Sequence, residues 1–290
     1  MAGVGRSVDD QALKVEHFSF GTHEINIKCR KSIQRTLNFK LTVQVQKEDL
    51  FESLRGWGGG YESDEDDQTS SQLASSSGDK DLLGLDVWPA AITLCDFLSK
   101  NESIVRGKKI IELGAGVGLP CLIAGKIGAS EAFISDYDSR VVDHAHQNAI
   151  DCGLGFVCKG LVLDWRHLEN LSDEHKHSYD VVLAADVMYI SQIMPDFVKS
   201  MDYVMAPDGL AILTHQCRQS LVLDQDSGVP VVIDVDVSFE KFKDVIGDYG
   251  FQMKLLSQWD SEGFPGPMNC FALARHPEIL GSLQGLDDVR

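Results

Sequence analysis

The sequence predicts an α/β fold, in which helices cover both faces of a doubly wound, mostly parallel sheet. Two observations lead to this prediction. From about residue 85 onward, short apolar runs typical of buried strands alternate with segments at helical spacing, and such alternation is typical of parallel strands joined by right-handed crossovers. In addition, Lys109–Gly118 reads KIIELGAGVG, an apolar strand followed by a glycine-rich turn. The fold is therefore expected to be Rossmann-like.

The chain before residue 85 differs in kind. Apolar residues fall on alternate positions over 15–27 and 36–45, which predicts an antiparallel hairpin or small sheet between these segments. Residues 56–81 combine a glycine triplet, an acidic run and a Ser/Gln-rich tract, and we expect a disordered loop because this stretch has little to bury. Three regions follow: a β extension over 1–55, the loop over 56–81 and the main domain over 82–290.

The main domain is expected to alternate its elements as follows. Helices are predicted over 89–98, 119–126, 139–152, 197–205 and 239–249, and strands over 109–113, 132–135, 157–163, 180–184, 210–214, 251–256 and 270–274, with an inserted loop or extra strand over 228–237. In a parallel sheet, ligands bind at the carboxyl ends of the strands. Gly114, Asp136, Asp164 and Asp186 each follow a predicted strand, so we expect them on one rim.

The glycine-rich turn predicts a site for a cationic ligand. Glycines at 114, 116 and 118 allow the backbone to approach a ligand closely. A dinucleotide-binding turn needs its third glycine one residue later, where this chain has Leu119. Glu112 precedes the turn, where an acid repels a pyrophosphate but attracts the ammonium of S-adenosylmethionine. These features favour a methyl-donor site over the cofactor site of an oxidoreductase.

The composition limits the kinds of partner and the cellular location that we expect. The formal net charge of −18 opposes binding to nucleic acid and is compatible with a partner that has a basic surface. The sequence contains no apolar run of bilayer length and no signal peptide, so we expect no membrane association. Seven scattered cysteines without a Cys-x-x-Cys pair predict neither disulfides nor a metal site. We expect a monomer in the cytoplasm, with the nucleus as the alternative.

Four segments, in order along the chain, resemble a known family. They are Val87-Trp88-Pro89-Ala90-Ala91, Ile111-Glu112-Leu113-Gly114-Ala115-Gly116, Ile134-Ser135-Asp136 and Ala184-Ala185-Asp186-Val187-Met188-Tyr189. Together they resemble class I, seven-β-strand S-adenosylmethionine-dependent methyltransferases, and within these the family-16 protein methyltransferases, most of which modify lysine. The resemblance covers about 85–214 and, more loosely, continues to 274. The long loop before Trp88 has no counterpart in shorter members, which leaves target recognition open.

The resemblance implies a set of cofactor-binding residues. Trp88 is expected to contact the cofactor, the turn to wrap its methionine portion, and Trp165 to lie against the adenine, with Asp164 holding the exocyclic amine. Asp136 is expected to accept hydrogen bonds from the ribose hydroxyls, since it lies about twenty residues beyond the glycines at the end of the second strand. The full set is Trp88, Glu112, Gly114, Ala115, Gly116, Asp136, Asp164, Trp165 and Ala185.

Asp186 and Tyr189 are the expected catalytic residues, because the last segment matches the Asp-x-x-Tyr signature of this family. Asp186 is expected to capture and orient a substrate lysine, and Tyr189 to form an aromatic wall and offer its hydroxyl. His215 and Cys217 are secondary candidates for a substrate-side role. Alternatives are a small-molecule N- or O-methyltransferase of the same fold, a non-catalytic S-adenosylmethionine-binding module, and a nucleophile other than lysine, such as histidine.

Overall fold

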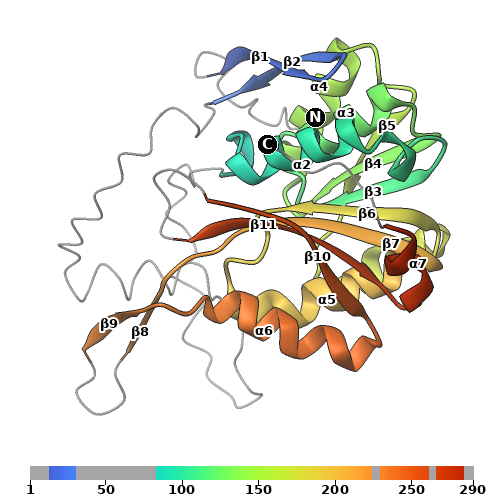
Figure 1. The fold of residues 1–290 in the computed structure, drawn as a ribbon. Helices are drawn as coiled ribbons and strands as arrows, with labels where there is room; N and C mark the ends of the chain where they lie inside the picture. Colours follow the sequence, from blue (N-terminus) through green and yellow to red (C-terminus); the bar gives the residue numbers. More distant parts are fainter. Residues whose placement is uncertain (1–12, 31–82, 224–228, 261–265, 284–290) are drawn as a thin grey trace, which may run out of the picture. The chain divides into compact units, whose positions relative to one another are not determined.

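The computed structural model describes residues 13–30, 83–223, 229–260 and 266–283. Its centre is a seven-stranded sheet in the order β10-β11-β7-β6-β3-β4-β5 (Figure 1). The strands are β3 Lys109–Leu113, β4 Glu131–Asp136, β5 Cys158–Val162, β6 Tyr179–Ala185, β7 Met205–Gln216, β10 Gln252–Asp260 and β11 Pro267–Ala274. Strands β3 to β7 are parallel to one another, and β11 is antiparallel to both β7 and β10. The predicted doubly wound, mostly parallel sheet is confirmed.

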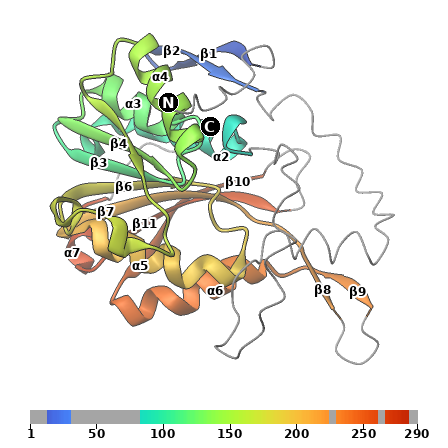
Figure 2. The same ribbon diagram turned by 180° about the vertical axis from the view of Figure 1, so that it is seen from behind.

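Helices cover both faces of this sheet. One core contains residues of α2 Pro89–Lys100, α3 Leu119–Ile127 and α4 Ser139–Asp151, and the other contains residues of α5 Met194–Val204 and α6 Val237–Ile246 (Figures 1 and 2). Successive residues of a strand point to opposite faces. Accordingly, Ile110 of β3 belongs to the first core and Ile111 to the second. This two-sided burial explains the continuous apolar run in the sequence.

The helix and strand predictions hold with shifted ends. Pro89 and Pro120 lie in the first turns of α2 and α3, where the missing N–H costs no hydrogen bond. Strand β7 begins at Met205, earlier than predicted, and α5 starts at Met194 rather than at residue 197. A short helix, α7 Pro277–Ser282, was not predicted. Single 3-10 turns span Leu83–Leu85, Glu102–Ile104, Leu168–Asn170, Asp173–His175, Ser191–Ile193 and Gly247–Tyr249.

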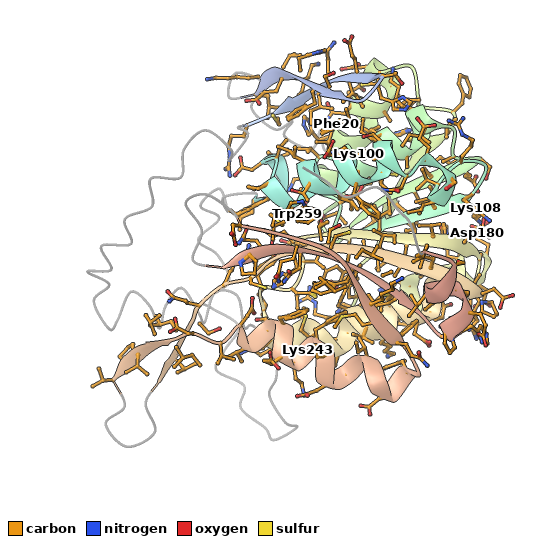
Figure 3. All side chains as sticks on the ribbon, in the orientation of Figure 1. Phe20, Lys100, Lys108, Asp180, Lys243 and Trp259 are labelled. Carbon is orange, nitrogen blue, oxygen red and sulfur yellow. The ribbon has the colours of Figure 1, made fainter. Side chains whose placement is uncertain are left out.

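The N-terminal hairpin differs from the expected pairing. Strand β1 Lys14–Phe20 pairs antiparallel with β2 His23–Cys29, so both strands come from the stretch that was predicted to be one half of the sheet. The expected partner at 36–45 and the loop at 56–81 lie outside the described residues. The hairpin packs on the helices, because Asn148 of α4 accepts a hydrogen bond from the Lys28 N–H at 2.9 Å and Phe20 is buried in the first core (Figure 3).

A second hairpin follows the end of β7. Strand β8 Ser220–Leu223 pairs antiparallel with β9 Pro230–Ile233, in the region where an inserted loop or extra strand was expected. It leads directly into α6. No helix in the described part is both long and apolar enough to cross a bilayer.

Candidate active site

The glycine turn after β3 has the backbone that its sequence requires. Gly114 and Gly116 adopt φ of +66° and +54°, in the left-handed region that disfavours other residues. A Cβ at position 114 would lie 2.9 Å from Val187 Cγ1 and 3.3 Å from Trp165 Cζ2. A Cβ at position 116 would lie 3.0 Å from the Gly84 carbonyl oxygen. The turn is therefore in close contact with two other predicted site segments, those around Trp165 and Val187.

Asp136 stands at the end of β4, beside this turn. Only 8% of the residue is exposed, and its carboxylate accepts hydrogen bonds from the Gly116 N–H at 3.2 Å and the Asp138 N–H at 3.3 Å. Burial raises the pKa of this carboxyl, while the backbone donors oppose the rise. A carboxylate offers about four acceptor sites. Asp136 therefore retains capacity for hydroxyl donors, as a ribose ligand requires.

Glu112 is buried at the end of β3, directly before the glycine turn. Only 1% of it is exposed, and its Oε2 accepts a hydrogen bond from the Cys121 N–H in the first turn of α3 at 2.8 Å. Burial raises the pKa of this carboxyl well above its ordinary value. Glu112 thus joins the end of β3 to the start of α3, at the two ends of the glycine turn, and its contact with the cofactor ammonium remains a prediction.

The other residues expected at the cofactor already have protein partners. Trp165 packs against Phe197 with ring centroids 4.9 Å apart, and its ring edge faces Gly114. The Asp164 carboxylate binds the Arg166 guanidinium through contacts of 2.6 and 2.9 Å, and this hydrogen bonding lowers the pKa of Asp164. The Trp88 indole N–H donates to the Leu83 carbonyl at 3.3 Å. Their cofactor contacts remain predictions.

Asp186 lies at the end of β6 with its side chain turned inward. It adopts a φ of +58°, which is strained for a non-glycine residue, and its N–H donates to the Thr214 carbonyl at 2.8 Å. Its side chain is 4% exposed, and Oδ2 accepts a hydrogen bond from Arg218 Nη2 at 2.6 Å. The carboxylate that was expected to capture a lysine therefore already binds a cation of this chain.

Tyr189 and Ala185 flank Asp186 in the sequence and are more accessible. Ala185 ends β6 and is partly exposed, and 47% of Tyr189 is exposed. Desolvation of its hydroxyl and the nearby Asp136 carboxylate raise the pKa of Tyr189 to about 12. The hydroxyl thus remains protonated at neutral pH and can donate a hydrogen bond.

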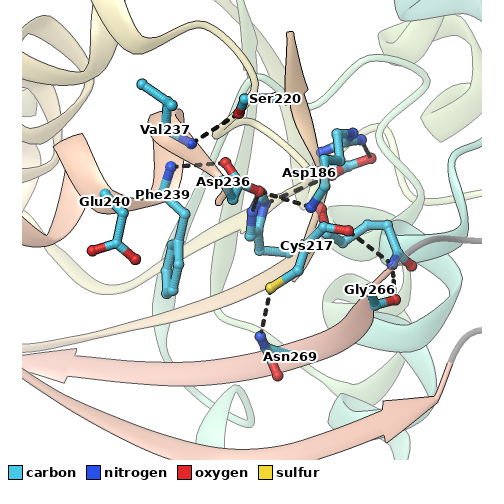
Figure 4. Close-up of polar contacts among 12 residues, drawn as sticks. Asp186, Cys217, Ser220, Asp236, Val237, Phe239, Glu240, Gly266 and Asn269 are labelled. Carbon is cyan, nitrogen blue, oxygen red and sulfur yellow. Dashed lines mark hydrogen bonds and ion pairs between the residues drawn. The ribbon is translucent and has the colours of Figure 1, made fainter. Parts of the chain in front are cut away.

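Three further residues complete the surroundings of Asp186 (Figure 4). Asp236 Oδ2 lies 2.8 Å from His215 Nε2 and accepts from the Arg218 N–H at 2.9 Å. Asp236 Oδ1 accepts from the Phe239 N–H at 3.0 Å and caps α6. Sequence reasoning named His215 as a secondary candidate but missed Arg218 and Asp236. An Asp before a helical segment indicates a cap, and nothing local in the sequence indicates its second role.

The sequence profile of a family described as "Lysine methyltransferase" matches residues 67–226, more than half of the chain. The chain belongs to this lysine methyltransferase family. The resemblance inferred from four short segments is thus confirmed, and S-adenosyl-L-methionine is the cofactor of the family.

Curated relatives have names that agree with the family. The chain is 31% identical over 135 residues to "Protein N-lysine methyltransferase METTL21A" of Danio rerio, covering 46% of this chain and 60% of the relative. It is 32% identical to "EEF1A lysine methyltransferase 3" of Mus musculus, covering 46% and 55%. It is 35% identical to "Protein-lysine N-methyltransferase EFM3" of Chaetomium thermophilum, covering 46% and 41%. The matches span about half the length of these relatives.

The residues present fit S-adenosylmethionine. Gly114 and Gly116 form a turn that side chains would fill, and the buried Asp136 carboxylate beside it retains acceptor capacity. In the described part of the chain, no group of His, Cys, Asp and Glu side chains is arranged to hold a metal ion.

Proposed function

We propose that this protein transfers a methyl group from S-adenosylmethionine to the side-chain amine of a lysine in a protein substrate. One observation carries the proposal. The Asp-x-x-Tyr segment lies against the glycine turn, since a Cβ on Gly114 would come within 2.9 Å of Val187 Cγ1. The residues expected at the donor and those expected at the acceptor amine are thus adjacent. Such proximity is what a displacement between two bound groups requires.

The residues of this site have separate proposed roles. Gly114, Ala115 and Gly116 would hold the methionine portion of the cofactor, and Asp136 would bind its ribose. When bound, the cofactor supplies an electrophilic methyl group on a positively charged sulfur. Asp186 attracts and orients the substrate ammonium, and Tyr189 contributes an aromatic wall and a hydroxyl donor. Presenting a lysine amine uncharged at pH 7 costs roughly 4–5 kcal/mol, because its reference pKa is about 10.4.

The partner is proposed to be a protein with a basic surface around its target lysine. This proposal rests on the formal net charge of −18, which favours encounter with positively charged surfaces. We propose that the protein acts as a monomer in the cytoplasm or, alternatively, in the nucleus, a location that its seven scattered cysteines without a Cys-x-x-Cys pair suit.

The test uses tritiated S-adenosylmethionine and cell extract as the source of acceptors. The wild type is expected to label a protein band, and mass spectrometry is expected to locate the methyl group on a lysine. Asp186→Asn should remove the labelling while calorimetry shows unchanged binding of S-adenosylhomocysteine. Asp180→Asn is the matched control, because Asp180 lies at the opposite end of β6 (Figure 3) and should leave labelling intact.

Other outcomes select the alternatives. Label found only in small metabolites indicates a small-molecule methyltransferase. Label on histidine changes the proposed acceptor. If the wild type binds neither S-adenosylmethionine nor S-adenosylhomocysteine, the catalytic proposal is wrong.

A further inference from the structure

Two buried polar atoms beside the proposed acceptor site lack hydrogen-bond partners among the described residues. They are Asp186 Oδ1 and His215 Nδ1, and they lie 3.9 Å apart. Burying an unpaired polar atom costs free energy, so a facing pair of such atoms is expected to have a functional reason.

The protonation of His215 follows from its other nitrogen. Nε2 lies 2.8 Å from Asp236 Oδ2, and the Asp236 carboxylate also accepts from the Arg218 and Phe239 N–H groups. An ionised carboxylate only accepts hydrogen bonds, so Nε2 must carry the proton. In the neutral ring, Nδ1 therefore presents a lone pair towards the Asp186 carboxylate. Two acceptors face each other, and one added proton would join them.

The charge balance around His215 also favours a proton on Nδ1. Among the described residues, the charged groups around it are Asp186 at the end of β6, Asp236 at the start of α6 and Arg218 after β7. Phe239 stacks on the ring at 5.2 Å, and Asn269 is its partner on β11; neither carries a charge. Two carboxylates and one guanidinium leave a net charge of −1 with neutral His215. Protonation of Nδ1 brings the cluster to neutrality.

Beside Phe239 on α6, two charged side chains pair with each other. Lys243 Nζ lies 2.7 Å from Glu240 Oε1, and Lys243 also lies over the Phe239 ring. This exposed pair adds no net charge on the side of His215 that faces α6.

We propose that Asp186 and His215 form a proton relay that accepts the proton lost by the substrate amine, with Asp236 positioning the His215 ring. The inference rests on the proposed function. An N–H bond of the substrate ammonium breaks, and Asp186 Oδ1 passes the proton to His215 Nδ1. The electron pair of that bond stays on the amine nitrogen as the lone pair that accepts the methyl group. The proton leaves to solvent after the product departs.

The test measures initial rates of label transfer to extract proteins from pH 6 to pH 10. The wild-type rate is expected to rise with pH and then to level. His215→Gln keeps a donor towards Asp236 but removes Nδ1, so its rate should fall about 100-fold at pH 7. The deficit should disappear near pH 10, where lysine loses its proton to solvent. His175→Gln, at a buried histidine outside the relay, should keep the wild-type profile.

Two further measurements keep the test decisive. Asp236→Asn retains the Oδ1 acceptor of the α6 cap. Like His215→Gln, it should lower the transfer rate at pH 7 more than near pH 10. It replaces His215→Gln in the test if that variant does not fold. Imidazole ¹⁵N spectra of the full chain should show His215 as the Nε2–H tautomer at pH 8.

An Nδ1–H tautomer, or a wild-type pH profile in His215→Gln with labelling intact, overturns the relay alone. If the wild type labels nothing while it binds S-adenosylhomocysteine, the proposed function fails and the relay fails with it.

Discussion

The rim of the sheet consists of two regions that are built differently. The proposed cofactor side, at the ends of β3 and β4, uses residues within 24 positions of one another, Glu112 to Asp136, and its buried carboxylates accept hydrogen bonds from backbone N–H groups. The proposed substrate side, at the ends of β6 and β7, joins Asp186 to Asp236 across 50 positions. Here a strained backbone and buried charges occur together with buried atoms that have no hydrogen-bond partner in the part of the chain that the structure describes.

The two regions thus differ in how their buried polar atoms are paired, and we expect them to respond differently to substitution. On the cofactor side, backbone N–H groups of the glycine turn and of α3 bind the carboxylates of Asp136 and Glu112. On the substrate side, Arg218 already neutralises the carboxylate proposed to attract a lysine, so a substrate cation has to share Asp186 with it or displace it. Perturbation of the first region should therefore change cofactor affinity, and perturbation of the second should change stability and transfer.

The largest expected effect is that of Gly114→Ala. The new Cβ combines a φ of +66° with a contact of 2.9 Å to Val187, and together strain and overpacking are worth about 3 kcal/mol. Affinity for S-adenosylhomocysteine should fall about 100-fold by calorimetry. Gly107→Ala is the matched control, since it has a φ of +73° and nothing within 4 Å, and it should lose only stability. Equal affinity losses in both variants would show that backbone strain, and not the contact between the new Cβ and Val187, causes the loss of affinity.

The next effect tests the substrate side. Arg218→Ala leaves the buried Asp186 carboxylate without its cation, and breaking a buried pair costs about 3–5 kcal/mol. Since 30% of the Arg218 side chain is exposed, we expect about 2 kcal/mol in urea unfolding. Affinity for S-adenosylhomocysteine should stay unchanged, and Arg218→Lys should recover part of the stability. A tenfold loss of affinity in Arg218→Ala would mean that the two regions are one unit.

The arrangement of the cofactor side could be predicted from sequence because its residues lie close together along the chain. The glycine turn, the helix that follows it and the acid at the end of the next strand all lie in one βαβ unit, where spacing fixes position. The mostly parallel sheet with helices on both faces followed from the same alternation, whereas the order of the strands in the sheet was not predicted. Glu112 shows the limit, because its neighbours in sequence did not reveal that its carboxylate points at the start of α3.

The substrate side could not be predicted because its contacts are distant in sequence. Asp236 follows the β8–β9 hairpin and meets His215 only after β7 and α6 have packed. The pairing of β1 with β2 was not predicted for a related reason. Period-two alternation indicates a strand but not its partner. The stretch 15–27 contains a turn at residues 21 and 22 that divides it into two strands.

Glu112→Gln should change how stability depends on pH. Burial raises the folded-state pKa of Glu112, so the folded protein holds this proton more tightly than the unfolded chain. The resulting stability is complete below the unfolded pKa of about 4.3 and is lost as pH rises through the folded-state value. Glutamine cannot ionise and can still accept from the Cys121 N–H, so the variant should lose less stability than the wild type between pH 5 and pH 9.

Glu102 should contribute to the pH dependence of stability with the opposite sign to Glu112. Hydrogen bonds from His23 and Arg106 lower its pKa, so its contribution is present above the unfolded pKa and is lost as pH falls through the folded-state value. Thermal melts of Glu112→Gln and Glu102→Gln across the pH range should diverge in opposite directions from the wild type. Parallel melting curves for Glu112→Gln and the wild type would argue against a buried, protonated Glu112.

Trp165→Phe should give the smallest effect and decides how far the cofactor side extends. The Trp165 ring edge faces Gly114, and an aromatic contact is worth about 0.5–1.5 kcal/mol, so a smaller ring should weaken S-adenosylhomocysteine binding about three- to tenfold. Trp259→Phe, on edge strand β10 (Figure 3), is the control and should not change affinity. If Trp165→Phe binds as the wild type does, Trp165 belongs to the packing around Phe197, and the adenine must be held by the other side of the rim.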